Sequence, residues 1–221
     1  VDSLVGSYMA TVFDFRVLEP MLYHQNVVSK HAIGGRGPGF ASIRFGLYYH
    51  VIQQCWKLGC DTDKRSFSAT RIFSALEPVT IARLRQQYGD LRISIDPSVD
   101  PETRKLFELM NRSDTDERQS EFDRRLEELK LLWREFKSSS YYYAIDDARK
   151  KVAAHSEVSQ FGEVFRAKDL SDVGIKWGDE RLFIDKLRGI VDLLNHLVRR
   201  ASFDWSRFDE QTERDARNYW K

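Results

Sequence analysis

The stretch ERQSEFDRRLEELKLLWREFK, residues 117–137, decides the fold class. Its apolar residues recur at alternating spacings of four and three, which places them on one stripe of a helix: Phe122, Leu126, Leu129, Trp133 and Phe136. The remaining positions are mostly charged. A charged helix with one continuous apolar stripe is typical of a helix-bundle contact, so we expect this stripe to be buried against other helices.

The same period recurs on both sides of this stretch. Residues 179–200 carry a second apolar row, formed by Phe183, Leu187, Ile190, Leu194 and Leu197. Residues 40–58 carry a third row, formed by Ile43, Leu47, Val51 and Trp56. Shorter helices are predicted over residues 11–31, 67–76, 79–88, 139–156 and 204–219, with Tyr143, Ile145, Val152 and Ala153 as buried positions of the fourth.

Helix boundaries are marked by capping and turn residues. Asp100 followed by Pro101 predicts a helix start. Breaks are predicted at residues 34–39, 58–66 and 111–117, and none is long enough to link independent domains. The run LRISID, residues 91–96, alternates as a strand does but has no evident partner. The sequence therefore predicts an all-α helical bundle that forms a single domain over residues 1–221.

Composition excludes several classes of protein. Of the 221 residues, 42% are hydrophobic and 31% are charged, and the net charge of +1 does not mark a strongly basic nucleic-acid binder. The chain has no run of 18 apolar residues, so no membrane span is predicted. The N-terminal residues lack a signal-peptide pattern, and two cysteines without metal-ligand spacing indicate a reducing compartment. Cys55 and Cys60 point in different directions on a helix, which disfavours a disulfide. We expect a cytoplasmic protein.

Other noticeable features are typical of ordinary structure. The glycine-rich GGRGPGF, from residue 34, matches neither a dinucleotide fingerprint nor a P-loop. His24 and His31 could share a helix face but lack a third metal ligand, so no metal site is expected. His196 near a helix end is interpreted as a charge that complements the helix dipole. The tyrosines at 141–143 indicate packing more than base stacking.

The segment DDARKKVAAHSE, residues 146–157, carries the candidate chemistry. Arg149 and His155 are six residues apart, or about 120° on an ideal α-helix, and the small residues between them leave room for a long arginine to reach across. Histidine transfers protons near neutral pH, and arginine stabilises charge that develops on phosphorus. RNA supplies its own nucleophile, the 2′-hydroxyl, so such a pair can cleave RNA without a metal.

RKKVAAHSE resembles the Arg-x(4–6)-His signature of HEPN domains, and its form is most similar to the AbiU-like abortive-infection branch of that superfamily. The likeness extends to YYHVIQQCWKLGCDTDKRSFSATRIFSAL and to FRAKDLSDVGIKWGDERLFIDKLRGIVDLLNHLV, and it is strongest over residues 40–200. The resemblance implies a HEPN-like bundle with additional N- and C-terminal helices. It also implies a metal-independent ribonuclease, without cofactors, that acts as a toxin or antiphage effector.

Carried over by position, Arg149 is the phosphate clamp and His155 the general acid and base, with Lys150 and Lys151 as further RNA contacts. Active members frequently have Asn, Asp or His after the arginine, where this chain has Lys150. The resemblance implies a two-fold homodimer that brings two motifs together, with RNA as substrate and an antitoxin or nucleotidyltransferase as candidate partners.

Two alternatives remain open for this segment. The chain can be a catalytically inactive HEPN-like module for protein or RNA binding, because some members of the superfamily lack activity. In that case His155 caps a helix end, and the bases from Arg149 to Lys151 form a solvated face paired with Asp146 and Asp147.

Overall fold

The computed structural model describes residues 1–220 except for residues 33–36, 91–98, 154–157, 162–163 and 168–173. The first helices in chain order are α1 (Asp2–Tyr23), α2 (Gln25–Ala32), α3 (Gly37–Gly59), α4 (Ala69–Ala75) and α5 (Pro78–Gly89). They are followed by α6 (Pro101–Lys137), α7 (Ser140–Ala148), the π-helical turn η2 (Arg149–Ala153), α8 (Asp179–Arg199) and α9 (Trp205–Tyr219). None of these helices combines the length and apolar character that crossing a lipid bilayer requires.

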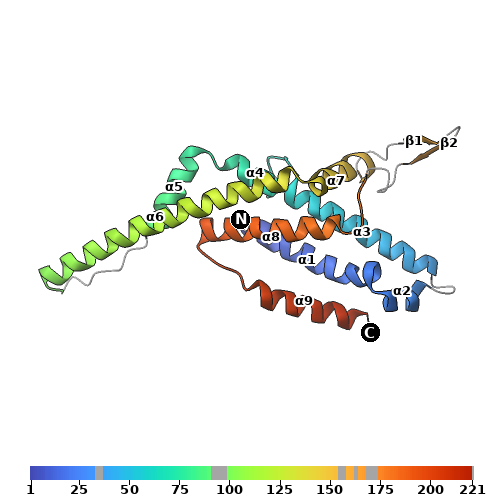
Figure 1. Cartoon of the computed structure of the whole chain (residues 1–221), viewed down its shortest axis with the longest axis horizontal. Helices are drawn as coiled ribbons and strands as arrows, with labels where there is room; N and C mark the ends of the chain where they lie inside the picture. Colours follow the sequence, from blue (N-terminus) through green and yellow to red (C-terminus); the bar gives the residue numbers. More distant parts are fainter. Residues whose placement is uncertain (33–36, 91–98, 154–157, 162–163, 168–173, 221) are drawn as a thin grey trace.

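The centre of the bundle is α8, which contacts α1, α3, α5, α6 and α7 (Figure 1). All five apolar residues predicted for α8 are buried, and four of the five on α6 are buried against it, with Trp133 half-buried. The all-α prediction is therefore confirmed for the bundle. The burial of apolar side chains on these helices, together with those of α1 and α3, stabilises the bundle.

The burial predicted for two side chains is wrong. Ile43 on α3 is 58% exposed and Tyr143 on α7 is 61% exposed. The buried row of α3 consists instead of Tyr48, Val51, Ile52, Cys55 and Leu58. Ile43 lies near the N-terminal end of α3, where the core takes up Phe40 and leaves Ile43 exposed.

Helix α6 is longer than predicted. It runs without interruption through residues 111–117, where a break was expected, and its outer part extends away from the bundle (Figure 1). Polar residues in that segment join the helix instead of ending it: Thr115 donates to the carbonyl of Asn111 at 2.7 Å. The predicted start is confirmed, because the Asp100 carboxylate accepts from the backbone N–H groups of Glu102 and Thr103 at 3.1 and 3.0 Å.

The predicted helix over residues 11–31 is in fact two helices. Helix α1 begins at Asp2 and ends at Tyr23, and His24 adopts an extended conformation before α2 begins at Gln25. His24 and His31 therefore do not share one helix face. His31 instead stacks on Phe40, with ring centroids 5.8 Å apart.

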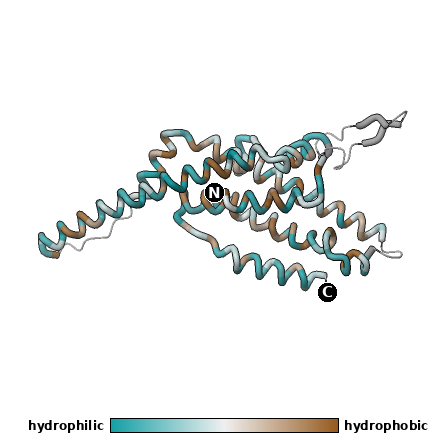
Figure 2. Tube along the Cα trace, in the orientation of Figure 1, coloured by the Kyte–Doolittle hydropathy of each residue, from teal (hydrophilic) through white to brown (hydrophobic). Residues whose placement is uncertain are grey.

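Helix α9 is mostly hydrophilic, as Figure 2 shows, and it is attached to the bundle by polar contacts as well as by the packing of Trp205 and Phe208 on the core. Arg188 of α8 forms a two-bond ion pair with Asp209, at 2.6 and 2.9 Å. The indole of Trp220, just after α9, donates to the backbone carbonyl of Val17 at 2.8 Å. The additional C-terminal helix thus closes over α1.

A buried carboxylate connects three helices. Glu180, at the start of α8, has no exposed surface and accepts hydrogen bonds from Tyr23 of α1 (2.8 Å) and Tyr48 of α3 (3.3 Å). The backbone N–H of Gly178 donates to both of its oxygens. Burial raises the pKa of Glu180 above its ordinary value.

A short antiparallel hairpin follows η2 and was not predicted. Strand β1 (Val158–Phe161) pairs with β2 (Val164–Ala167), with Val158 opposite Ala167. The expected strand at residues 91–96 lies outside the described residues.

Candidate functional site

The segment that carries the sequence motif is partly α-helical and partly π-helical. Ser139 caps α7 by accepting from the N–H of Tyr142, and Ile145 and Ala148 bury one side of the helix. From Arg149 to Ala153 the backbone forms η2, in which N–H groups bond to carbonyls five residues earlier. The predicted α-helix over 139–156 is therefore corrected, and the 120° offset calculated for α geometry does not apply. Single π turns are rare in proteins, and a large share of those known lie at functional sites.

Of the two candidate catalytic residues, the structure describes one. Arg149 is half-buried, and its guanidinium carbon lies 4.9 Å from the centroid of the Trp56 ring on α3. At this distance the positive charge is attracted to the ring face. His155 lies outside the described residues, as do the side chains of Val152 and Ala153. The prediction that Arg149 and His155 converge stays a prediction.

Asp146 holds the Trp56 ring in place. The indole N–H of Trp56 donates to one oxygen of the Asp146 carboxylate at 3.0 Å. The other oxygen accepts from the Lys150 ammonium. Trp56 is thus fixed by a hydrogen bond on its edge while Arg149 lies on its face. From the sequence, Trp56 was expected in the core and Asp146 as a partner of the motif's bases, and the hydrogen bond between Trp56 and Asp146 was not predicted.

The three bases of the motif differ in their partners. Lys150 pairs with Asp146 and Lys151 with Asp147, each four residues earlier on the helix, and the bond to Asp146 raises the pKa of Lys150. Arg149 forms no ion pair with any carboxylate of the described residues. Among the described residues it is thus the one base of the motif without a carboxylate partner. The RNA contacts of Lys150 and Lys151 stay a prediction.

The loop after α3 and the start of α4 brace α7. Ser68 caps α4 by accepting from the N–H of Arg71 at 3.1 Å, and its hydroxyl donates to the carbonyl of Asp61. Thr70 donates to the carbonyl of Gly59 at 2.5 Å and lies 3.5 Å from the hydroxyl of Tyr142 on α7. The end of α3, the start of α4 and α7 are thus joined by hydrogen bonds about two turns before Arg149.

Neither cysteine is poised for chemistry. Cys55 and Cys60 are both free and buried, which confirms that they form no disulfide. Burial raises the pKa of each thiol well above its ordinary value, so both remain protonated and are poor nucleophiles at neutral pH.

Two further histidine interpretations can be compared with the structure. The Nε2 atom of His196 forms a hydrogen bond with the Tyr88 hydroxyl, 2.7 Å away. Burial lowers the pKa of the His196 imidazole. His196 lies in the last turn of α8, as predicted, but its lowered pKa disfavours the charge that the dipole interpretation requires. Within the ranges that the structure describes, no three His, Cys, Asp or Glu side chains gather as metal ligands. Metal independence stays a prediction to be tested with chelators.

Comparison with known proteins gives one match. A HEPN-type family model described as AbiU2 matches residues 8–219, which extends the likeness seen over residues 40–200 to α1 and α9. No curated protein and no solved structure matches the chain. The family match covers both the Arg149 segment and the helices that support it.

Proposed function

Because the chain belongs to the HEPN-type AbiU2 family, we propose that it is a metal-independent endoribonuclease that acts as a toxin or antiphage-defence effector. Arg149 and His155 carry the reaction. The observation that supports this best is the state of Arg149: it stands in a π-helical turn, rests on Trp56, and has no carboxylate partner among the described residues.

The proposed reaction is attack by the ribose 2′-hydroxyl. His155 takes the proton of that hydroxyl, the 2′-oxygen forms a bond to phosphorus, and the bond from phosphorus to the 5′-oxygen breaks. Arg149 binds the phosphate oxygens and stabilises the added negative charge of the transition state. The products are a 2′,3′-cyclic phosphate and a 5′-hydroxyl, whose proton comes from a protonated imidazole.

We expect the active form to be a two-fold homodimer. The motif of one protomer supplies a single histidine, His155, whereas the reaction uses one group as base and another as acid. A dimer whose interface includes α7 and η2 would bring two copies of His155 to one cleft. Two-fold closure is also the commonest assembly of soluble proteins. Light scattering that gives a monomer mass at micromolar concentration would contradict this part of the proposal.

A second candidate is a catalytically inactive HEPN-like binding module. The ion pairs of Lys150 and Lys151 favour it, because they neutralise two of the three bases beside the motif. A chain that binds RNA or a protein partner without cutting it would show the same helical framework. Only an activity measurement separates the two candidates.

The test is cleavage of single-stranded RNA by the purified protein in excess EDTA. The expected result is a 2′,3′-cyclic product from RNA and no product from DNA of the same sequence. His155→Ala should lower the rate by roughly a hundred- to ten-thousand-fold, and Arg149→Ala should lower both rate and affinity.

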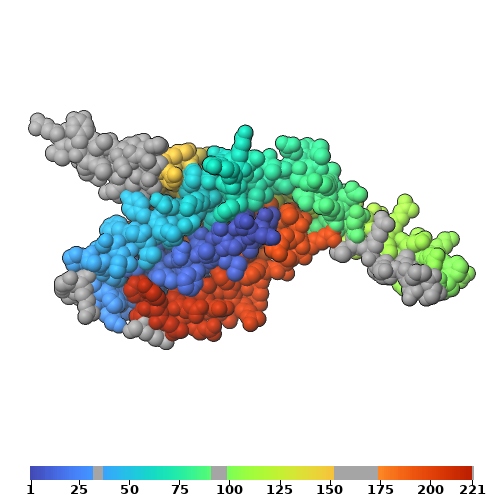
Figure 3. Space-filling model, turned by 180° about the vertical axis from the view of Figure 1, so that it is seen from behind, coloured from blue at the N-terminus to red at the C-terminus, as the bar shows by residue number. Residues whose placement is uncertain are grey.

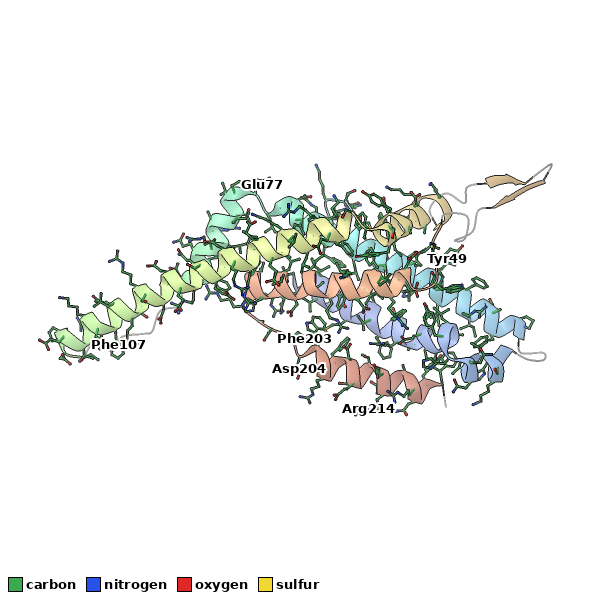
Figure 4. All side chains as sticks on the ribbon, in the orientation of Figure 1. Tyr49, Glu77, Phe107, Phe203, Asp204 and Arg214 are labelled. Atoms are coloured by element: carbon green, nitrogen blue, oxygen red, sulfur yellow. The ribbon has the colours of Figure 1, made fainter. Side chains whose placement is uncertain are left out.

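Matched controls keep the result specific. His24→Ala and Arg214→Ala remove the same residue types at exposed positions, and Arg214 lies on α9 at a distance from η2 (Figure 4). Both should cleave as the wild type does. RNA binding without cleavage by the wild-type protein would favour the binding module. Cleavage that survives His155→Ala would place the activity elsewhere or in a contaminant.

A further inference from the structure

One partly exposed face of α3 carries a row of aromatic side chains. Phe45, Tyr49 and Trp56 are separated by four and seven residues, so they share a face of the helix. Phe45 is 49% exposed, and Tyr49 and Trp56 are partly exposed. The row spans about 16 Å along the helix axis. It ends at Trp56, on which Arg149 rests.

This row borders the face of α3 that forms the core. The core takes up Val51, Ile52, Cys55 and Leu58, each at most 1% exposed, and Ile52 lies only about 20° from Phe45 around the helix axis. Tyr49 and Trp56 are partly buried and pack against the core on one side, whereas Phe45 does not. Figure 3 shows the N-terminal half of α3 open to solvent along one edge of the molecule, and Figure 4 places Tyr49 farther along α3, toward α7. Packing within the bundle therefore does not account for the exposed ring of Phe45.

The charges on α3 itself favour an anion, and the Asp146 carboxylate of α7, which holds Trp56, is paired with Lys150. Residues 37–59 contain Arg44 and Lys57 but no Asp or Glu, in a chain with 34 acidic residues. The Arg44 guanidinium carbon lies 5.7 Å from the centroid of the Phe45 ring, as Arg149 lies 4.9 Å from that of Trp56. An arginine thus stands against the ring at each end of the row. Aromatic rings interleaved with cations are the arrangement by which proteins hold single-stranded nucleic acid.

We propose that Phe45 and Tyr49 form a stacking platform for the bases of single-stranded RNA, which leads the strand along α3 to Arg149 on the ring of Trp56. The role of the platform as an approach to a cleavage site rests on the proposed ribonuclease function, whereas its binding of a single strand does not. Stacking requires a base and not a 2′-hydroxyl, so single-stranded DNA binds to the platform as well. Binding is tolerant of sequence, because every base has a stacking face.

The test measures the affinity of the full chain for a fluorescein-labelled twelve-nucleotide DNA and for the RNA of the same sequence, in EDTA. Phe45→Ala should weaken binding of both by about 5- to 100-fold, since it removes one stacked base. Phe45→Leu should weaken binding nearly as much, because it keeps an apolar side chain without a ring face. Phe45→Trp should retain wild-type affinity or increase it.

The matched control is Ile43→Ala. Ile43 is equally apolar, is 58% exposed on the same helix, and lies about 160° around the axis from Phe45. This variant should bind within twofold of the wild type. Because Phe45 and Ile43 are both exposed, neither substitution should alter the melting temperature by more than a few degrees, which circular dichroism checks.

The outcomes separate the platform from the catalytic proposal. Phe45-dependent binding of DNA and RNA without any cleavage supports the platform and contradicts the ribonuclease. Cleavage that is unaffected by Phe45→Ala and Phe45→Leu, with unchanged affinity, overturns the platform and leaves the ribonuclease standing. A wild type that binds neither nucleic acid overturns both. If Phe45→Leu binds like the wild type, or Phe45→Ala changes only self-association, the exposed face is an apolar protein contact and the platform is wrong.

Discussion

The guanidinium carbon of Arg149 lies over the ring of Trp56, 4.9 Å from its centroid, while the indole N–H of Trp56 is held by Asp146. Within the described part of the chain, the arginine is positioned by an aromatic face and not by a carboxylate. A carboxylate partner would neutralise its charge and compete with a phosphate, whereas a ring face leaves the N–H groups at its edge available. The same Asp146 carboxylate pairs with Lys150, so it determines how much positive charge the segment presents.

Asp146→Asn should strengthen RNA binding. The amide oxygen can still accept from Trp56, but the Lys150 ammonium loses its anionic partner and becomes available to phosphate. Affinity should rise about two- to fivefold at low salt, and the slope of log K against log salt should steepen by about one unit. Fluorescence anisotropy across a salt series measures both quantities.

Asp147→Asn is the matched control for that variant. It releases Lys151 in the same way but leaves Trp56 untouched. If both variants strengthen binding equally, the effect is general electrostatics. If Asp146→Asn weakens binding, the charge of Asp146 is needed to hold Trp56 beneath Arg149, and the expected direction is wrong.

The helices of the core could be predicted because their apolar period is regular. The α6 and α8 rows are each amphipathic over several turns, and such a pattern has one way to bury its apolar side. The expected break at residues 111–117 was wrong for a local reason. Asn111, Ser113 and Asp114 are weak helix formers, but none of them forbids a helix as proline would.

Other features depend on information that a helical period does not contain. The π turn at Arg149–Ala153 and the contact of Arg149 with Trp56 arise when α7 packs on α3, so neither is visible in local sequence. The hairpin strands are four residues each, too short for a periodic signal. Its sequence does carry a hint: Gly162 and Glu163 separate two short runs, which is a two-residue hairpin spacing.

Glu180→Gln should change how stability depends on pH. Burial raises the pKa of Glu180 in the folded chain, so the folded state binds this proton more tightly than the unfolded state does. Its contribution to stability is therefore full below the unfolded pKa of about 4.3, and is lost as pH rises through the folded pKa. Gln cannot titrate, so wild type should lose stability relative to the variant as pH rises.

Urea unfolding of both proteins at a series of pH values measures this difference. Other carboxylates act in the opposite direction, since hydrogen bonds from Arg124 and Arg125 lower the pKa of Glu121 to about 2. They are common to both proteins and cancel in the comparison. A difference that is constant with pH, or that grows in favour of wild type, would show that Glu180 is ionised at no cost in the folded chain.

Asp209→Ala should loosen α9. It removes both bonds to Arg188 and leaves that guanidinium, which also donates to the hydroxyl of Tyr8, partly buried without its anionic partner. The cost in free energy of unfolding should be about 1.5 to 3 kcal/mol. Limited proteolysis should cut first in residues 200–204, before α9. Glu210→Ala, at an exposed position of the same helix, should have little effect on either measurement.

Two glycines of α3 give opposite predictions for the same substitution. A Cβ at Gly59 would meet the rings of Phe183 and Phe136, which are fully buried and held by their neighbours, so α3 approaches α8 there as closely as a glycine allows. Gly59→Ala should therefore destabilise the chain by roughly 1 to 3 kcal/mol. At Gly46, a Cβ would meet no atom within 4 Å, and alanine is the better helix former. Gly46→Ala should stabilise the chain by about 0.5 to 1 kcal/mol.

Thermal melts of the two variants test which face of α3 packs against α8. If both substitutions are neutral, the face of α3 that packs against α8 has been assigned incorrectly, and the aromatic face that carries Phe45 and Tyr49 would be assigned incorrectly with it.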